Sequence, residues 1–178
     1  MNEHMFVILP ATSKEQLMAS RRHVFISHHH ADDQLVSNMT DLLARGGYEI
    51  RNSSIRAKPA NQERLDKGLV SDRTIKRLLR MKMAWASTVI VLVGKDTAKR
   101  PWVDWEIQKA HQLGKRIVGV YERGGTENDI PDKLESYASA IVNWNADSIV
   151  AAVEGENTFQ TPTGKQREPA HTGSTSRC

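Results

Sequence analysis

The chain has 178 residues, of which 39% are hydrophobic and 26% charged, and its formal net charge is +4 at pH 7. Its single cysteine, Cys178, excludes a disulfide framework and a metal site built from cysteines. No apolar run approaches the ~18 residues of a membrane span, and the run at residues 5–9 lacks the basic flank and cleavage site of a secretory signal. We therefore expect a cytoplasmic protein that has no membrane partner.

Hydrophobic periodicity predicts strands and helices that alternate along the chain. In chain order these are a strand at 24–26, a helix with the apolar residues Leu35, Met39, Leu42 and Leu43, a strand at 48–50, a loop at 51–68, a helix capped by Ser71, a strand at 88–93, a helix at 101–113, a strand at 115–121, a strand at 140–142 and a helix at about 146–153. Residues 88–93, Thr-Val-Ile-Val-Leu-Val, form an unbroken run that does not alternate, which is typical of a strand buried on both faces of a parallel sheet. We therefore predict an α/β fold of three layers, with a doubly wound, five-stranded, mostly parallel, flavodoxin-like sheet.

Composition divides the chain into three parts. Residues 1–20 form an N-terminal leader whose pattern fits either a docked helix or a mobile segment. Residues 21–154 contain all the predicted elements and form the domain. Residues 155–178 are rich in Gly, Thr, Ser, Pro and charge, so we expect a disordered polar tail.

The helix that follows Ser71 carries much of the positive charge. It combines one acid, Asp72, with five bases, Arg73, Lys76, Arg77, Arg80 and Lys82, and its predicted apolar stripe is Ile75, Leu78, Leu79 and Met83. Two interpretations stay open: the solvated face of an amphipathic helix, or a surface that faces a dinucleotide phosphate or an acidic partner. Nucleic acid is disfavoured as a partner, because no aromatic residue interleaves with these charges before Trp85.

Ligands of open parallel sheets bind at the carboxyl ends of the strands. This rule selects residues 27–33, the loop after Ile50, residues 94–100 and the segment from Tyr121 onward. No G-x-G-x-x-G follows the first strand and no Walker motif occurs, which argues against an ordinary Rossmann dehydrogenase and a Walker-type NTPase. A receiver domain would need an aspartate at the end of the third strand, where Val93 and Gly94 stand.

Three consecutive histidines, His28, His29 and His30, follow the first strand. Adjacent side chains in an extended loop alternate in direction, and no further ligands stand at a suitable spacing. We therefore predict no metal site, and expect one or two of these histidines to line a polar pocket.

Glu106 is the most informative residue of the helix at 101–113. It lies beside the predicted apolar stripe of Val103, Ile107, Ala110 and Gly114. A carboxylate in this position is costly to desolvate and tends towards a raised pKa. It is either a functional carboxylate in a cleft or a structural partner of Lys109 or of the basic helix.

Several segments together resemble a known family. These are Val24-Phe25-Ile26-Ser27-His28-His29-His30-Ala31-Asp32, Asn52-Ser53-Ser54-Ile55, Val89-Ile90-Val91-Leu92-Val93-Gly94 with Thr97, and Arg100-Pro101-Trp102-Val103-Asp104-Trp105-Glu106-Ile107. They are similar to the TIR-like proteins of bacterial antiphage defence, and most of all to the ThsB component of Thoeris systems. The last segment matches the W-x-x-x-E helix of TIR enzymes, and the resemblance extends over residues 22–153.

The resemblance implies a TIR-like fold and an enzyme that cleaves the bond between nicotinamide and ribose in NAD+. NAD+ is then the substrate, and no cofactor is implied. The ADP-ribose part becomes a cyclic or conjugated signal that activates a separate effector. Self-association on activation and a phage-derived trigger are further implied partners.

The resemblance also implies site residues. Glu106 is the catalytic carboxylate, while Ser27, His28 and His30 border the nicotinamide side, and Ser53 and Ser54 belong to a loop that closes over the dinucleotide. Trp102 packs against the ribose or the pocket wall, or else it is a core aromatic. The identity of the product and the contacts of the loop after Ile50 stay open.

Other function classes remain as alternatives. The chain could be a non-catalytic TIR-type adaptor that acts by homotypic assembly through the basic helix. It could also sense a nucleotide without turnover, or transfer a deoxyribosyl group with a similar glutamate.

Overall fold

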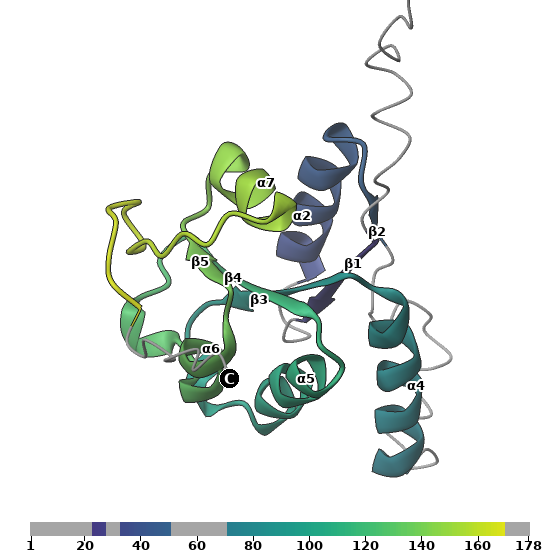
Figure 1. The fold of residues 1–178 in the computed structure, drawn as a ribbon. Helices are drawn as coiled ribbons and strands as arrows, with labels where there is room; N and C mark the ends of the chain where they lie inside the picture. The colour runs from purple at the N-terminus through teal and green to yellow at the C-terminus, as the bar shows by residue number, and fades with distance from the viewer. Residues whose placement is uncertain (1–22, 28–32, 51–70, 170–178) are drawn as a thin grey trace, which may run out of the picture.

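The computed structural model describes residues 23–27, 33–50 and 71–169, which form a sheet covered by helices on both faces (Figure 1). The strands are β1 (His23–Ser27), β2 (Glu49–Ile50), β3 (Thr88–Val93), β4 (Arg116–Tyr121) and β5 (Ala140–Val142). The α-helices are α2 (Asp33–Arg45), α4 (Asp72–Trp85), α5 (Pro101–Gln112), α6 (Asp132–Tyr137) and α7 (Ala146–Glu154), and the 3-10 helices are η1 (Thr97–Lys99) and η2 (Glu127–Asp129).

The sheet is parallel throughout its described part, with the order β2-β1-β3-β4-β5. The edge strand β2 contributes only two residues, and the other four strands have three or more. This order reverses direction between β1 and β3, which makes their carboxyl ends the topological switch point of a doubly wound sheet. The predicted fold class is therefore confirmed.

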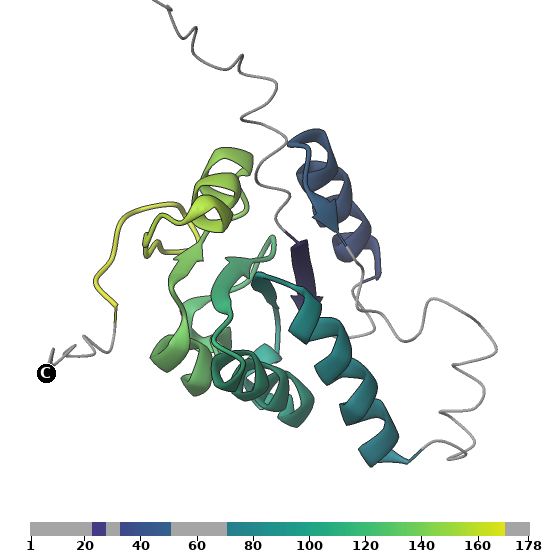
Figure 2. The ribbon, with the colours of Figure 1, turned by 45° about the vertical axis from the view of Figure 1, so that its right-hand side comes forward.

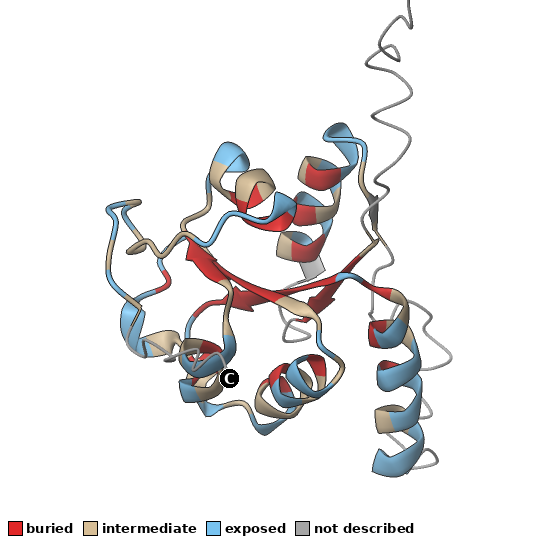
Figure 3. Cartoon of the chain, viewed as in Figure 1, coloured by how far each residue is buried: buried red, intermediate tan, exposed pale blue. Residues whose placement is uncertain are grey.

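Two apolar cores lie on opposite faces of the sheet (Figure 3). One face packs against α2 and α7, and the other against α4, α5 and α6. All six residues of β3 are buried, as the unbroken apolar run predicts. The alternation along β3 sends Ile90 and Leu92 into the first core and Val89, Val91 and Val93 into the second.

The helix termini follow local chemistry. Ser71 caps α4, because its hydroxyl accepts a hydrogen bond from the backbone N–H of Thr74 at 3.4 Å. Pro101 occupies the first turn of α5, where its missing N–H leaves no helical bond unmade. Beyond the end of α5, Gly114 has a φ of 63°, a left-handed conformation that suits glycine.

Some details of the predicted helices are wrong. Leu78 was expected in the apolar stripe of α4 but is 42% exposed, whereas Leu79 and Met83 are buried. Gly114 was expected in the stripe of α5, but it lies beyond the helix and is exposed. The short helix α6 was not predicted, because a six-residue helix offers too few positions for a periodic pattern.

Residues 155–169 also differ from the prediction of a disordered tail. After α7 the chain returns to the free edge of β5, where Phe159 forms a parallel bridge with Ile141. The N–H of Ile141 donates to the carbonyl of Thr158 at 3.0 Å, and that of Gln160 to the carbonyl of Ile141 at 2.7 Å. One aromatic residue and a few backbone bonds therefore order a segment whose composition is polar. Residues 170–178 and the leader at 1–20 lie outside the described residues.

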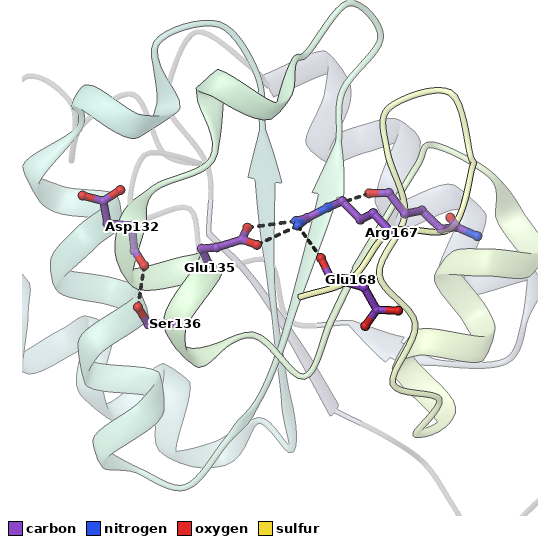
Figure 4. Close-up of polar contacts among 6 residues, drawn as sticks. Asp132, Glu135, Ser136, Arg167 and Glu168 are labelled. Atoms are coloured by element: carbon purple, nitrogen blue, oxygen red, sulfur yellow. Dashed lines mark hydrogen bonds and ion pairs between the residues drawn. The ribbon is translucent and has the colours of Figure 1, made fainter. Parts of the chain in front are cut away.

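Arg167 fastens this segment to α6 (Figure 4). Its guanidinium donates from Nη1 to Glu135 Oε1 at 2.7 Å and from Nη2 to Oε2 at 2.9 Å, and both side chains are 15% exposed. The guanidinium also lies 5.8 Å from the ring centre of Phe159. A bidentate pair with little exposure to water is stronger than an ordinary surface pair.

We expect Arg167→Ala to lower the free energy of unfolding by about 1 to 2 kcal/mol, because it leaves the Glu135 carboxylate without its bidentate donor. Urea denaturation at neutral pH measures the change. Lys99→Ala is the matched control, because Lys99 pairs with Asp96 on the surface, where the two side chains are 79% and 40% exposed. This substitution should not measurably change the free energy of unfolding. Equal losses in the two variants would contradict a stabilising role for the Arg167 pair.

Candidate functional site

Glu106 lies on the second turn of α5, which begins after β3 at the carboxyl edge of the sheet. The neighbouring residues Val103 and Ile107 are 4% and 0% exposed, and they anchor the helix to the sheet. Glu106 itself is partly exposed and lies beside this buried stripe. The rotation of α5 that buries Ile107 therefore also brings the Glu106 carboxyl close to the end of the sheet.

Ser27 is the last residue of β1 and is 1% exposed. Its hydroxyl donates a hydrogen bond to Oε2 of Glu106, a residue 79 positions later in the chain. Ser27 pairs in register with Val91 of the neighbouring strand β3. The two residues thus meet at the topological switch point, where parallel sheets of this kind bind ligands.

The carboxyl of Glu106 has a strongly perturbed acidity. Burial raises the pKa of Glu106 from 4.5 to about 7, while the hydrogen bond from Ser27 lowers it in part. Among the described residues, no cation contributes to the pKa of Glu106. Perturbed carboxyl groups of this kind are concentrated at functional sites.

The ion pairs that would give Glu106 a purely structural role, with Lys109 or with the bases of α4, are not present in the described part of the chain. Lys109 donates instead to Gln112 Oε1 at 2.5 Å, one turn further along α5. None of the bases of α4 forms an ion pair with Glu106 among the described residues, and its hydrogen-bond donor there is Ser27. The interpretation of Glu106 as a structural ion-pair partner is therefore wrong for this part of the molecule.

Two tryptophans accompany Glu106 on α5. Trp102, one turn before Glu106, is 39% exposed, so it is not a core aromatic. Trp105 is partly buried and packs against the second core, and the two rings meet edge to face with centroids 5.9 Å apart. The Nζ of Lys76 on α4 lies 5.5 Å from the ring centre of Trp102 and 5.8 Å from that of Trp105. The role of Trp102 in substrate binding stays a prediction.

The remaining predicted site residues cannot be placed. His28, His30, Ser53 and Ser54 lie outside the described residues, so their roles stay predictions. In the part of the chain that the structure describes, no three His, Cys, Asp or Glu side chains gather to hold a metal ion. Within the same part, no helix combines the length and apolar character that crossing a bilayer demands.

Sequence reasoning selected Glu106 and Ser27 but missed the contact between them. The expected role of Ser27 at the nicotinamide stays a prediction, and the structure adds its hydrogen bond to Glu106. The sequence also did not predict the position of Lys76 over the tryptophans. A basic helix face has the same sequence pattern whether or not an aromatic surface lies beneath it.

Comparison with known proteins identifies related sequences. The family model described as "Thoeris protein ThsB, TIR-like domain" matches residues 25–127, more than half of the chain. The protein of Bacillus cereus (strain MSX-D12) named "Putative cyclic ADP-D-ribose synthase ThsB1" is 37% identical over 51 residues, which are 29% of this chain and 27% of that protein. The matched part thus spans about a quarter of this curated relative. The structure of the Clostridium botulinum CMP N-glycosidase BcmB is similar with a TM-score of 0.48 and 14% identity, covering 75% of this chain and 98% of that chain.

The raised pKa of Glu106 makes the stability of the fold depend on pH. The unfolded chain releases this proton near pH 4.5, whereas the folded chain retains it up to about pH 7. Stability is therefore lost as the pH rises from about 4.5 through 7, because the folded state must then hold a desolvated charge.

We expect Glu106→Gln to raise the free energy of unfolding at pH 8 by about 2 kcal/mol, allowing for the partial exposure of the residue, and to change it little at pH 4. Urea denaturation of both chains across this range measures the difference. Asp104→Asn is the control on the same helix and should not reproduce the pH dependence. A gain that is the same at both pH values would contradict the raised pKa.

Proposed function

Because this chain belongs to the ThsB family of TIR-like domains from Thoeris antiviral defence systems, we propose that it cleaves NAD+ between nicotinamide and ribose. The proposed product is an ADP-ribose-derived signal, cyclic or conjugated, that activates a separate effector. The observation that carries the proposal is the desolvated Glu106 carboxyl at the switch point of the sheet, held by Ser27. NAD+ is the substrate in this proposal, and no resident cofactor takes part.

The chemistry of the bond suits a single carboxylate. When the ribose C1′–N bond breaks, its electron pair neutralises the pyridinium, so nicotinamide leaves without a general acid. Positive charge then develops on the ribose as an oxocarbenium ion, which a nearby carboxylate stabilises. In a poorly hydrated site this attraction is much stronger than in water. With a pKa of about 7, a large fraction of the Glu106 carboxyl is ionised at neutral pH.

The fate of the ADP-ribose part separates the possible products. Attack on C1′ by water gives free ADP-ribose, attack by a nucleophile of the same molecule gives a cyclic product, and attack by another metabolite gives a conjugate. The name of the Bacillus cereus relative, "Putative cyclic ADP-D-ribose synthase ThsB1", favours the cyclic product among these three. Self-association, a phage-derived trigger and the cytoplasm as the place of action complete the proposal.

We expect infected cells that express this chain to accumulate an ADP-ribose-derived species that is absent from cells expressing Glu106→Gln. Mass spectrometry of small molecules during phage infection measures it, together with the amount of NAD+. Asp104→Asn is the matched control, because it neutralises a carboxylate of the same helix that is not the hydrogen-bond partner of Ser27. The control should retain the species at the level of the unchanged chain.

The same experiment separates the enzyme from the adaptor. If cells with the unchanged chain and cells with Glu106→Gln contain identical metabolites and are equally protected from the phage, the proposal of an enzyme is wrong. Protection that is instead lost on reversing two charges of α4, with Glu106→Gln unaffected, would assign the chain to homotypic assembly. Stable NAD+ binding without any product would assign it to nucleotide sensing.

We expect NAD+ cleavage to rise with pH through about 7, as Glu106 ionises. Ser27→Ala should move this midpoint to higher pH. The hydroxyl of Ser27 stabilises the ionised carboxyl, so removing it raises the pKa of Glu106. The pH dependence of kcat measures the shift. Ser87→Ala is the control, because that hydroxyl donates to the backbone carbonyl of His23, at the opposite end of β1. An unchanged midpoint in Ser27→Ala would contradict the assigned role of Ser27.

A further inference from the structure

The basic face of α4 meets the tryptophans of α5 beside the candidate site. Figures 1 and 2 show α4 and α5 on the same face of the sheet. The two helices touch where the Nζ of Lys76 lies 5.5 Å from the ring centre of Trp102 and 5.8 Å from that of Trp105. Trp102 precedes Glu106 by one helical turn, so this cation lies over the turn of α5 that comes before the carboxylate of the proposed reaction, without lowering the pKa of Glu106.

The charge of this surface is not neutralised within the described part of the molecule. Lys76 is partly buried on the indoles, and Arg73, Arg77 and Arg80 are exposed on the same helix. None of these four side chains has an acidic or hydrogen-bonding partner among the described residues. A concentrated positive potential next to a ligand site attracts anionic ligands.

The direction of the helices brings these groups to the ligand edge of the sheet. α4 ends at Trp85, shortly before β3 begins at Thr88, so its first turns lie near the opposite, carboxyl end of β3. α5 begins after β3 at this same edge. Fourteen helical residues extend about 21 Å and six strand residues about 20 Å, so the start of α4 is level with the end of β3.

We propose that Lys76, supported by Trp102, binds the diphosphate of the dinucleotide while its nicotinamide ribose lies at Glu106. This inference rests on the proposed function and adds the residue that recognises the phosphates. A compact ammonium group is a suitable donor to phosphate oxygens, and the position of the Lys76 Nζ over the two indole rings limits its freedom. The tryptophans also offer exposed ring surface for the planar groups of the ligand.

A series of ligands tests the proposal. NAD+, nicotinamide mononucleotide and nicotinamide riboside carry two, one and no phosphate groups, so the effect of Lys76 should decrease along the series. Binding is measured by calorimetry with the full chain carrying Glu106→Gln, so that the ligand is not consumed. Adding Lys76→Gln should weaken NAD+ binding about 10-fold, which corresponds to one charge-assisted hydrogen bond. Nicotinamide riboside should bind as before.

Two further variants sharpen the test. Lys76→Arg keeps the positive charge and should retain most of the affinity for NAD+. Lys165→Gln removes the same charge from the exposed C-terminal segment beside β5, and it should leave all three affinities unchanged. Raising the salt concentration should weaken NAD+ binding more in the presence of Lys76 than in Lys76→Gln.

The outcomes for the inference and for the proposed function are distinguishable. Unchanged NAD+ affinity in Lys76→Gln, an equal loss for nicotinamide riboside, or no binding of NAD+ at all would overturn the inference. Unchanged affinity together with weaker self-association in sedimentation would assign the surface to protein docking instead. If NAD+ binds through Lys76 but the unchanged chain makes no product in infected cells, the proposed function fails and the phosphate site stands.

Discussion

The complete burial of β3 is the constraint on which the rest of this structure depends. A central parallel strand that is apolar on both faces requires helices on both sides, and five of its six buried residues supply the two cores. α5 must then turn Val103 and Ile107 towards the sheet. Glu106 stands between these two positions in the helix, so the packing that stabilises the domain also holds a carboxyl near the switch point.

Holding Glu106 there has an energetic consequence. Desolvation raises the pKa of Glu106 to about 7, so its ionised form, which the proposed reaction requires, is the form that destabilises the folded chain. Ser27 offsets part of this cost by donating its hydroxyl to the carboxylate. The fold is thus more stable with a neutral Glu106, whereas the proposed reaction requires the ionised form. Such an opposition between stability and chemistry is typical of functional sites.

Sequence patterns predicted features that depend on short-range periodicity. The strands at 88–93 and 140–142 have their predicted bounds, and the inconsistency of Glu106 within the apolar stripe of α5 was visible from its spacing. The contact of Ser27 with Glu106 spans 79 positions and depends on the strand order, which no local pattern contains. The sequence pattern did not predict a defined structure for residues 155–169 for a similar reason. That structure depends on the contacts of Phe159 with β5 and of Arg167 with α6.

The C-terminal segment also limits how copies of this chain could associate. An open sheet has two edges, and an unpaired edge strand can add a strand from another molecule. At β5 the backbone of Ile141 already bonds to Thr158 and Gln160, and Arg167 fastens the segment to Glu135. Strand addition at β5 would require this segment to leave. Within the described part of the chain, this leaves helical surfaces or the β2 edge for the proposed self-association, unless Arg167 first releases Glu135.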